Sequence, residues 1–186
     1  MRARPLALLL AIALSLGACT RRPGADDDPV PIDVQTMAYL SEARAFHHQA
    51  SLKEETNDLP GAIASLERLT RAARPHPDRA VPEVEEVLAD AYARLAELEL
   101  QAGDLAGAER AVKEGLGHAT EPTFFRGHLV EVQGLVEKAR SASLADAGRP
   151  DEARAARERA IQLLDEAVKI QDKVVQGSLR DGGARR

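Results

Sequence analysis

The sequence predicts an all-α protein, built as an α-solenoid of about three antiparallel helical hairpins. The first observation is a turn pattern that occurs three times, at residues 57–62, 103–108 and 148–153. Each copy opens with Asn or Gly, which tolerate the left-handed backbone that ends a helix, and has an Ala five residues later. The second observation is composition: Ala, Leu, Glu and Arg dominate, and aromatic residues make up only 3% of the chain. A recurring helical hairpin predicts a repeat protein.

The first 18 residues have the three-part layout of an export signal. The apolar run from Leu6 to Leu16 is too short to span a bilayer of about 30 Å as a helix. Its end, residues 16–19, reads Leu-Gly-Ala-Cys and resembles the lipobox of bacterial lipoproteins. That resemblance implies cleavage before Cys19 and a covalent lipid on its thiol. Because Thr20 is not Asp, it also implies the periplasmic face of the outer membrane. The alternative is an ordinary secretory signal with a chance cysteine.

Residues 19–32 contain three prolines and the run Asp26 to Asp28, which predicts a disordered tether. The run lacks the spaced ligands of an EF-hand, so no calcium site is expected. Cys19 is the only cysteine, which excludes an intramolecular disulfide and a Cys-based metal site. Without Arg2 and Arg4, 23 basic and 30 acidic side chains leave a net charge of −7. Acidic balance argues against nucleic acid as a partner.

Residues 33–176 are expected to form the helical domain. Asp33 caps a first helix over roughly 33–56, and a second helix follows the turn at residue 57 and stops before Pro75. The apolar positions predicted for these two helices are Met37, Leu40, Ala43, Phe46 and Ala50, then Ile63, Leu66, Leu69 and Ala73.

Pro82 opens the third helix, which has the most regular apolar stripe of the chain. That stripe consists of Val84, Val87, Leu88, Ala91, Tyr92, Leu95 and Leu98. The fourth helix is predicted from Leu105 to Leu116, ending at Gly117.

The segment 120–122 is expected to start the fifth helix, and Pro150 the sixth. Their apolar positions are Phe125, Leu129, Val132, Leu135, Val136 and Ala139, then Ala153, Ala160, Ile161, Leu164, Ala167, Val168 and Val175. Gly177 is expected to close the sixth helix, with residues 177–186 as a disordered tail.

Residues 33–170 resemble tetratricopeptide repeats. The matching positions are Tyr92, Leu95, Ala96 and Ala108 in the second hairpin, Phe46, Ala50 and Ala62 in the first, and Ala153 and Ala160 in the third, where Glu137 replaces the bulky residue. The turns lie 46 and 45 residues apart, counted from Asp58 to Asp104 and from Gly103 to Gly148, whereas the family has about 34. That period also suits HEAT-type repeats. The resemblance implies a right-handed solenoid.

In the family it resembles, the first helix of each hairpin lines a groove that binds a peptide or a partner helix. By position, the residues expected to face such a groove are Arg44, His47, Ser51, Asp90, Glu97, Lys138 and Asp146. The Lys/Asn pattern that clamps a terminal carboxylate in some members is missing. His47 and His48 are adjacent and point about 100° apart on a helix, so they are poorly placed to share a metal.

The chain has no Gly-rich phosphate loop, zinc signature or nucleophile elbow, so neither catalysis nor a metal is expected, and Cys19 would carry the only covalent group. Two functions stay open. One is a lipid-anchored envelope scaffold or adaptor that binds a protein partner in its groove, in assembly or regulation of an envelope complex. The other is a periplasmic ligand-binding component of a transport system. A closed apolar cavity favours the second, and an open groove with a polar floor favours the first.

Overall fold

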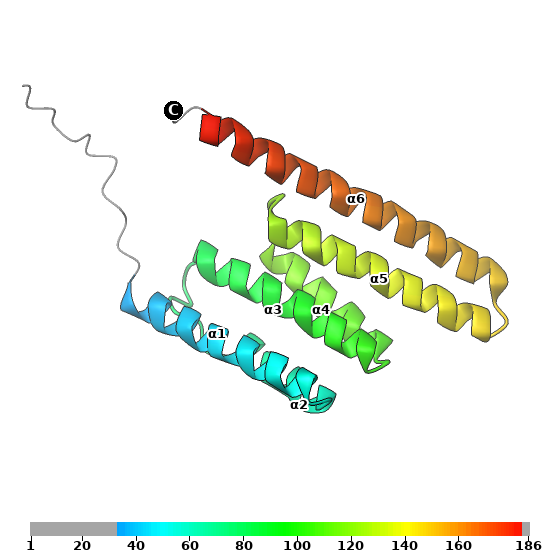
Figure 1. Ribbon diagram of the computed structural model, residues 1–186, viewed down its shortest axis with the longest axis horizontal. Coiled ribbons are helices and arrows are strands. Elements are labelled where there is room, and N and C mark those ends of the chain that lie inside the picture. Colours follow the sequence, from blue (N-terminus) through cyan, green and yellow to red (C-terminus); the bar gives the residue numbers. More distant parts are fainter. Residues whose placement is uncertain (1–32, 184–186) are drawn as a thin grey trace, which may run out of the picture. The chain divides into compact units, whose positions relative to one another are not determined.

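The computed structural model describes residues 33–183, with side chains described through Arg180. Over this range the protein is all-α and contains no strand. The helices are α1 (Val34–Glu55), α2 (Leu59–Thr70), α3 (Pro82–Gln101), α4 (Leu105–His118), α5 (Phe124–Asp146) and α6 (Pro150–Gly183) (Figure 1). The predicted signal peptide, Cys19 and tether lie outside the described residues. Within the described range, no helix is both long enough and apolar enough to cross a membrane.

Three short turns join the helices into the hairpins α1/α2, α3/α4 and α5/α6. The residues predicted to end the first helix of each hairpin do have left-handed backbone: φ is +61° at Asn57, +78° at Gly103 and +71° at Gly148. Asn or Gly is favoured there because a Cβ atom makes this region costly for most residues. The hairpin turns are confirmed.

The first two turns also start the next helix with an Asp side chain, which accepts a hydrogen bond from one of the exposed backbone N–H groups at the helix N-terminus. Asp58 Oδ1 accepts a hydrogen bond from the Gly61 N–H at 3.0 Å, and Asp104 Oδ1 accepts one from the Gly107 N–H at 2.8 Å. At the third turn Pro150 is the first helical residue.

The helices α1, α3 and α5 lie in a row, and α2 and α4 lie behind them in the view of Figure 1. Within the described range, α2 contacts α1 and α3, α4 contacts α3 and α5, and α6 contacts only α5. The largest buried cluster spans α1 to α5, and Leu66, Leu98, Leu129 and Val132 have no exposed surface in it. Burial of such side chains stabilises the fold by about 1.5–3 kcal/mol each.

The apolar face of α1 was predicted correctly at Ala43, Phe46 and Ala50, which are buried, but not in the first two turns of the helix. Met37 is 53% exposed, whereas Thr36 and Tyr39 are buried together with the predicted Ala43 and Phe46. In the first two turns, the predicted and the observed buried positions differ by one residue. The packing of α1 against α2 and α3 decides which of them is buried. In α2, Leu66 and Leu69 are buried as predicted, but Ala73 lies beyond the end of the helix at Thr70 and is exposed.

Two glycines do not end helices as predicted. Gly117 lies inside α4, which runs to His118, and Gly177 lies inside α6, which runs to Gly183. Residues 177–183 of the predicted disordered tail are therefore helical, and residues 184–186 lie outside the described range. Neither glycine has positive φ. A glycine inside a helix costs about 1 kcal/mol and does not break it by itself. Helix α5 also begins later than predicted, with Thr123 as its N-cap.

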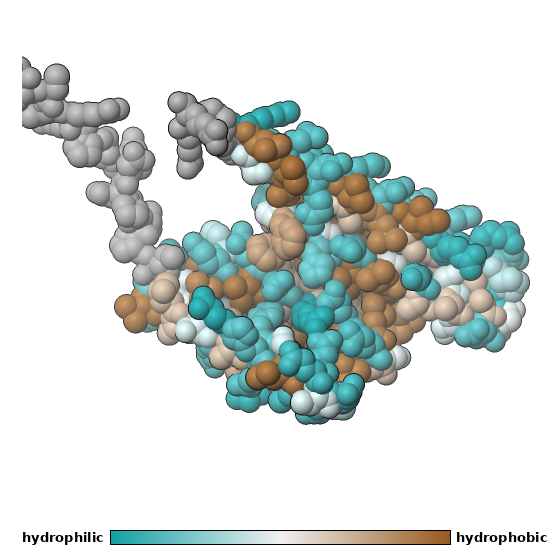
Figure 2. All heavy atoms as spheres, in the orientation of Figure 1, coloured by the Kyte–Doolittle hydropathy of each residue, from teal (hydrophilic) through white to brown (hydrophobic). Residues whose placement is uncertain are grey.

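The sixth helix exposes part of its predicted apolar stripe. Ala153, Ala160 and Ala167 are buried against α5, but Ile161, Val168 and Val175 are 55–61% exposed. Figure 2 shows hydrophobic patches along this helix. The predicted stripe combined two sides of α6, and α5 covers only one of them.

Candidate functional site

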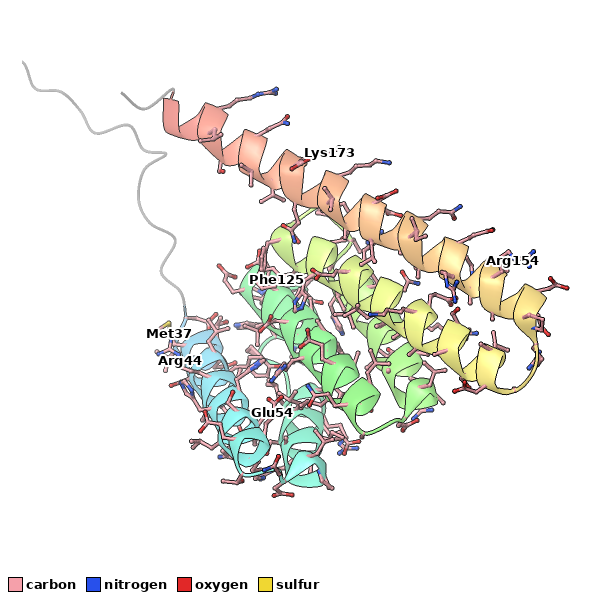
Figure 3. All side chains as sticks on the ribbon, turned by 45° about the vertical axis from the view of Figure 1, so that its right-hand side comes forward. Met37, Arg44, Glu54, Phe125, Arg154 and Lys173 are labelled. Atoms are coloured by element: carbon pink, nitrogen blue, oxygen red, sulfur yellow. The ribbon has the colours of Figure 1, made fainter. Side chains whose placement is uncertain are left out.

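The first helices of the three hairpins share one polar surface. We call it the α1–α3–α5 face and define it by the side chains that are joined to one another across these helices: His47, Glu54, Asp90, Arg94, Glu97 and His128. Glu54 points from α1 toward α3 (Figure 3). Each of these residues belongs to α1, α3 or α5. The face therefore draws on every hairpin.

Between α1 and α3, two pairs of side chains meet. His47 Nε2 lies 3.8 Å from Asp90 Oδ2, and Arg94 forms an ion pair with Glu54. Burial lowers the pKa of His47, and the nearby Asp90 carboxylate opposes this shift. The His47 imidazole is therefore neutral at pH 7, and its contact with Asp90 is a polar contact rather than a full ion pair.

Between α3 and α5, Glu97 is the shared residue. Its carboxylate accepts a 2.9 Å hydrogen bond from Arg94 Nη1 and lies 3.3 Å from His128 Nε2. The hydrogen bond with His128, together with that from Arg94, lowers the pKa of Glu97, and the same bond to Glu97 raises the pKa of His128. Glu54, Arg94, Glu97 and His128 thus form a chain of interactions that crosses all three helices.

The predicted groove residues fall into two groups. His47, Asp90 and Glu97 do come together on the α1–α3–α5 face, with Arg44 and Ser51 exposed beside them on α1. Figure 3 shows Arg44 extending outward from α1.

The other two predicted residues, Lys138 and Asp146, are exposed on α5, and no described contact joins them to the face. Sequence reasoning missed Glu54, Arg94 and His128. A signal was present for two of them, because Glu54 follows His47 by seven residues and Arg94 precedes Glu97 by three, which is spacing on one side of a helix.

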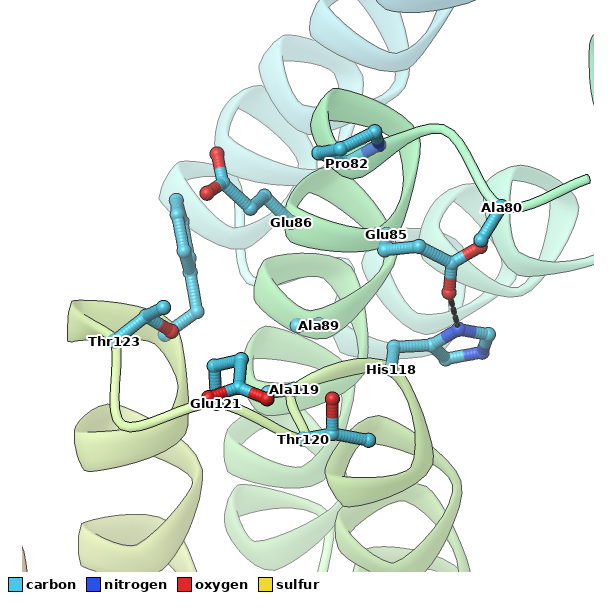
Figure 4. A pocket seen from close by; sticks show the side chains of 11 residues that line it. Ala80, Pro82, Glu85, Glu86, Ala89, His118, Ala119, Thr120, Glu121 and Thr123 are labelled. Atoms are coloured by element: carbon cyan, nitrogen blue, oxygen red, sulfur yellow. Dashed lines mark hydrogen bonds and ion pairs between the residues drawn. The ribbon is translucent and has the colours of Figure 1, made fainter.

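A pocket of about 260 Å³ lies beside this face, where the start of α3, the end of α4 and the connection to α5 meet (Figure 4). We call it the α3–α5 pocket. It is largely apolar, is open to solvent, and is lined by Ala80, Pro82, Glu85, Glu86, Ala89, His118, Ala119, Thr120, Glu121, Thr123 and Phe125.

One wall of the pocket is held by a cluster of polar side chains. His118 Nδ1 lies 2.6 Å from Glu85 Oε2, as the dashed line in Figure 4 marks. Arg74 Nη1 lies 3.6 Å from Glu85 Oε1, and its Nη2 lies 3.4 Å from His118 Nε2. The His118 ring also stacks on Tyr92, with ring centroids 5.5 Å apart. These contacts hold Glu85 and His118 in place.

The described pocket lining does not contain a hydroxyl nucleophile that is hydrogen-bonded to His118, as a catalytic site would require. The lining hydroxyl groups belong to Thr120 and Thr123, and in the described part of the chain neither is hydrogen-bonded to His118. Thr123 instead caps α5 by accepting a hydrogen bond from the Arg126 N–H at 3.3 Å. Among residues 33–180, no three His, Cys, Asp or Glu side chains gather as metal ligands would.

Compared with known proteins, the chain matches no protein-family model, no curated protein and no solved structure. The fold class therefore rests on the structure itself, and the function must be inferred from the site.

Proposed function

We propose that the protein is a lipid-anchored scaffold or adaptor of the cell envelope, and that it binds a protein partner through the α1–α3–α5 face. Its helices would form an α-solenoid of tetratricopeptide-like hairpins. The row of α1, α3 and α5, with α2 and α4 packed behind it, supports this architecture. In such stacks, successive hairpins present one continuous binding surface.

The observation that carries the proposal is the chain of polar interactions across the face. Glu54, Arg94, Glu97 and His128 hold one another in fixed positions, so that a partner meets ordered charged groups rather than mobile ones. Ordering these side chains before binding reduces the entropy cost of forming a complex. The exposed Arg44 and Ser51 add groups that are free to contact a partner.

The side chains that define the α1–α3–α5 face are all polar or charged, which supports a protein partner over the ligand carrier of a transport system. A carrier for a small ligand typically encloses most of the ligand surface. The described pockets, of about 260 to 430 Å³, are instead open to solvent.

The anchor is proposed from Cys19 and its lipobox. Several acyl chains, at about 0.8 kcal/mol for each buried CH₂ group, hold a protein on a membrane far more firmly than one chain. The Cys19→Ala variant should lose incorporation of a labelled fatty acid and leave the membrane fraction, or stay unprocessed. Equal labelling of parent and variant would rule out the anchor.

Site-specific photo-cross-linking in intact cells tests the binding face. A cross-linker at Arg44 or Ser51 should give one discrete protein adduct. The matched control is Lys113, which is exposed on α4 and is not part of the face. An adduct that forms from Lys113 but not from Arg44 or Ser51 would show that the partner binds elsewhere.

A further inference from the structure

We propose that the α3–α5 pocket binds the side chain of a lysine or arginine residue of the partner protein. The aliphatic stem would lie on the apolar floor, and the cationic group would lie near Glu86 and Glu121. The inference rests on the proposed function, because it names a feature of the partner that the protein would recognise.

The floor of the pocket fits an aliphatic stem. Ala80, Pro82 and Phe125 supply accessible apolar surface over the buried Ala89 and Ala119, and the space measures about 260 Å³. Lysine and arginine side chains bury their methylene groups against apolar surface while their charged ends stay near water. An aromatic ring such as Phe125 can also attract a cation that lies over its face.

The charges at the pocket favour a cation over an anion. Glu86 and Glu121 both line it and are exposed, and neither forms an ion pair with another described residue. Two nearby guanidinium groups are already engaged: Arg74 contacts Glu85 and His118, and Arg126 Nη1 donates a 2.7 Å hydrogen bond to the Ala119 carbonyl. The two carboxylates therefore remain available to a basic side chain.

The pocket is also placed where a partner on the α1–α3–α5 face could reach it. Glu86 precedes Asp90 by four residues in α3, so the two side chains lie on the same side of the helix, one turn apart. A partner segment that contacts Asp90 and Arg94 could extend along α3 and insert a basic side chain beside Glu86. The pocket would then fix the position of the partner along the face.

Nuclear magnetic resonance titration of the purified protein with N-acetyl-L-arginine amide tests the inference. The probe has a guanidinium group as its only charge, and it should cause saturable shifts in the methyl signals of Ala89, Ala119 and Thr123. N-acetyl-L-norleucine amide, which has an uncharged aliphatic side chain, should bind at least fivefold more weakly.

Two double variants separate the pocket from a general effect of charge. Glu86→Gln with Glu121→Gln should weaken binding of the arginine probe at least fivefold. Glu83→Gln with Glu114→Gln removes the same charge from two exposed positions of α3 and α4 outside the pocket, and should leave binding unchanged.

Absence of saturable methyl shifts would overturn the inference. Equal binding of the norleucine probe, or equal loss of binding in both double variants, would do so as well. None of these results would change cross-linking from Arg44 or Ser51, so failure of the pocket and failure of the proposed binding face can be told apart.

Discussion

The buried carboxyl group of Glu99 in α3 lies against Gly107 in the first turn of α4. A Cβ atom at Gly107 would come within 2.9 Å of Glu99 Cδ and 2.6 Å of Asp104 Oδ2. Glu99 is only 9% exposed, and its Oε2 has no hydrogen-bond partner among the described residues. Burial, reinforced by the Asp104 carboxylate, raises the pKa of Glu99 to about 7. The hairpin α3/α4 therefore encloses a carboxyl group that is easier to bury when protonated.

We predict that Glu99→Gln stabilises the protein at alkaline pH. The pKa of Glu99 in the folded state is above its ordinary value of 4.5, so the folded state binds the proton more tightly. This group therefore makes the free energy of unfolding fall as pH rises from about 4.5 to about 7. Glutamine keeps the shape and cannot ionise, so the variant should exceed the parent by about 1–2 kcal/mol at pH 8. Urea denaturation at pH 4.5 and pH 8 measures this, and the same difference at both values would contradict it.

Two glycines of α4 should respond to alanine in opposite directions. A Cβ atom at Gly115 would lie 2.6 Å from Leu129 Cδ2 and 2.9 Å from Tyr92 Cβ, whereas at Gly117 no such atom lies within 4 Å. Gly115→Ala should destabilise the protein by about 1–3 kcal/mol through overpacking. Gly117→Ala should stabilise it by about 0.5–1 kcal/mol, because alanine favours the helix. Thermal unfolding of the two variants separates these outcomes, and a Gly115→Ala protein as stable as the parent would disprove the close approach of α3, α4 and α5.

Ala108→Leu tests the close packing of α4 against α3. Ala108 is fully buried, in the same cluster as Leu95 and Ala96. Extra methylene groups there should cost about 1–3 kcal/mol. Ala106→Leu is the matched control, since Ala106 lies in the first turn of the same helix and is exposed, and should change stability by less than about 0.5 kcal/mol. Coincident urea midpoints for the two variants would show that Ala108 does not lie at a tight helix crossing.

The contact between Glu97 and His128 should make the packing of α3 on α5 sensitive to pH. The folded-state pKa of His128 is raised above its ordinary value of 6.5. Its contribution to stability is therefore complete below pH 6.5 and is lost as pH rises through the folded-state value. The stability difference between the parent and His128→Gln should shrink between pH 5.5 and pH 8.5.

The size of this effect should be below about 1 kcal/mol, because both side chains are partly exposed. His48→Gln is the control: His48 is exposed on α1 and is not part of the face. If the two variants show the same pH dependence, the Glu97–His128 contact does not stabilise the packing of α5 on α3.

Local chemistry explains which parts of the fold could be predicted. Asp104 directly follows Gly103, and Pro150 comes two residues after Gly148, so at both turns the end of one helix and the start of the next reinforce each other. Gly177 is followed by Ser178, but the Ser178 hydroxyl donates a 2.8 Å hydrogen bond to the Val175 carbonyl inside α6 instead of capping a new helix, and the prediction of a stop there was wrong. The face of α1 depended on how α2 and α3 pack around it, which the spacing of apolar residues alone does not determine.

The site was predictable only in its general position. Their positions in the resembled repeats selected His47, Asp90 and Glu97, and the structure places these three residues on the α1–α3–α5 face. Which side chains on that surface contact one another depends on how far each hairpin is shifted along the next one. The α3–α5 pocket forms where the start of α3, the end of α4 and a short connection meet. The local sequence around Glu86 therefore does not predict it.

The contacts among the described helices join only neighbours, or next neighbours, along the chain. Proteins whose contacts are this local commonly fold within microseconds to milliseconds, because little loop entropy is lost before favourable contacts form. Each hairpin can cover its own apolar stripe soon after its two helices are available. The sequence predicts an export signal. For an exported chain, such early burial shortens the time during which exposed hydrophobic surface can lead to aggregation.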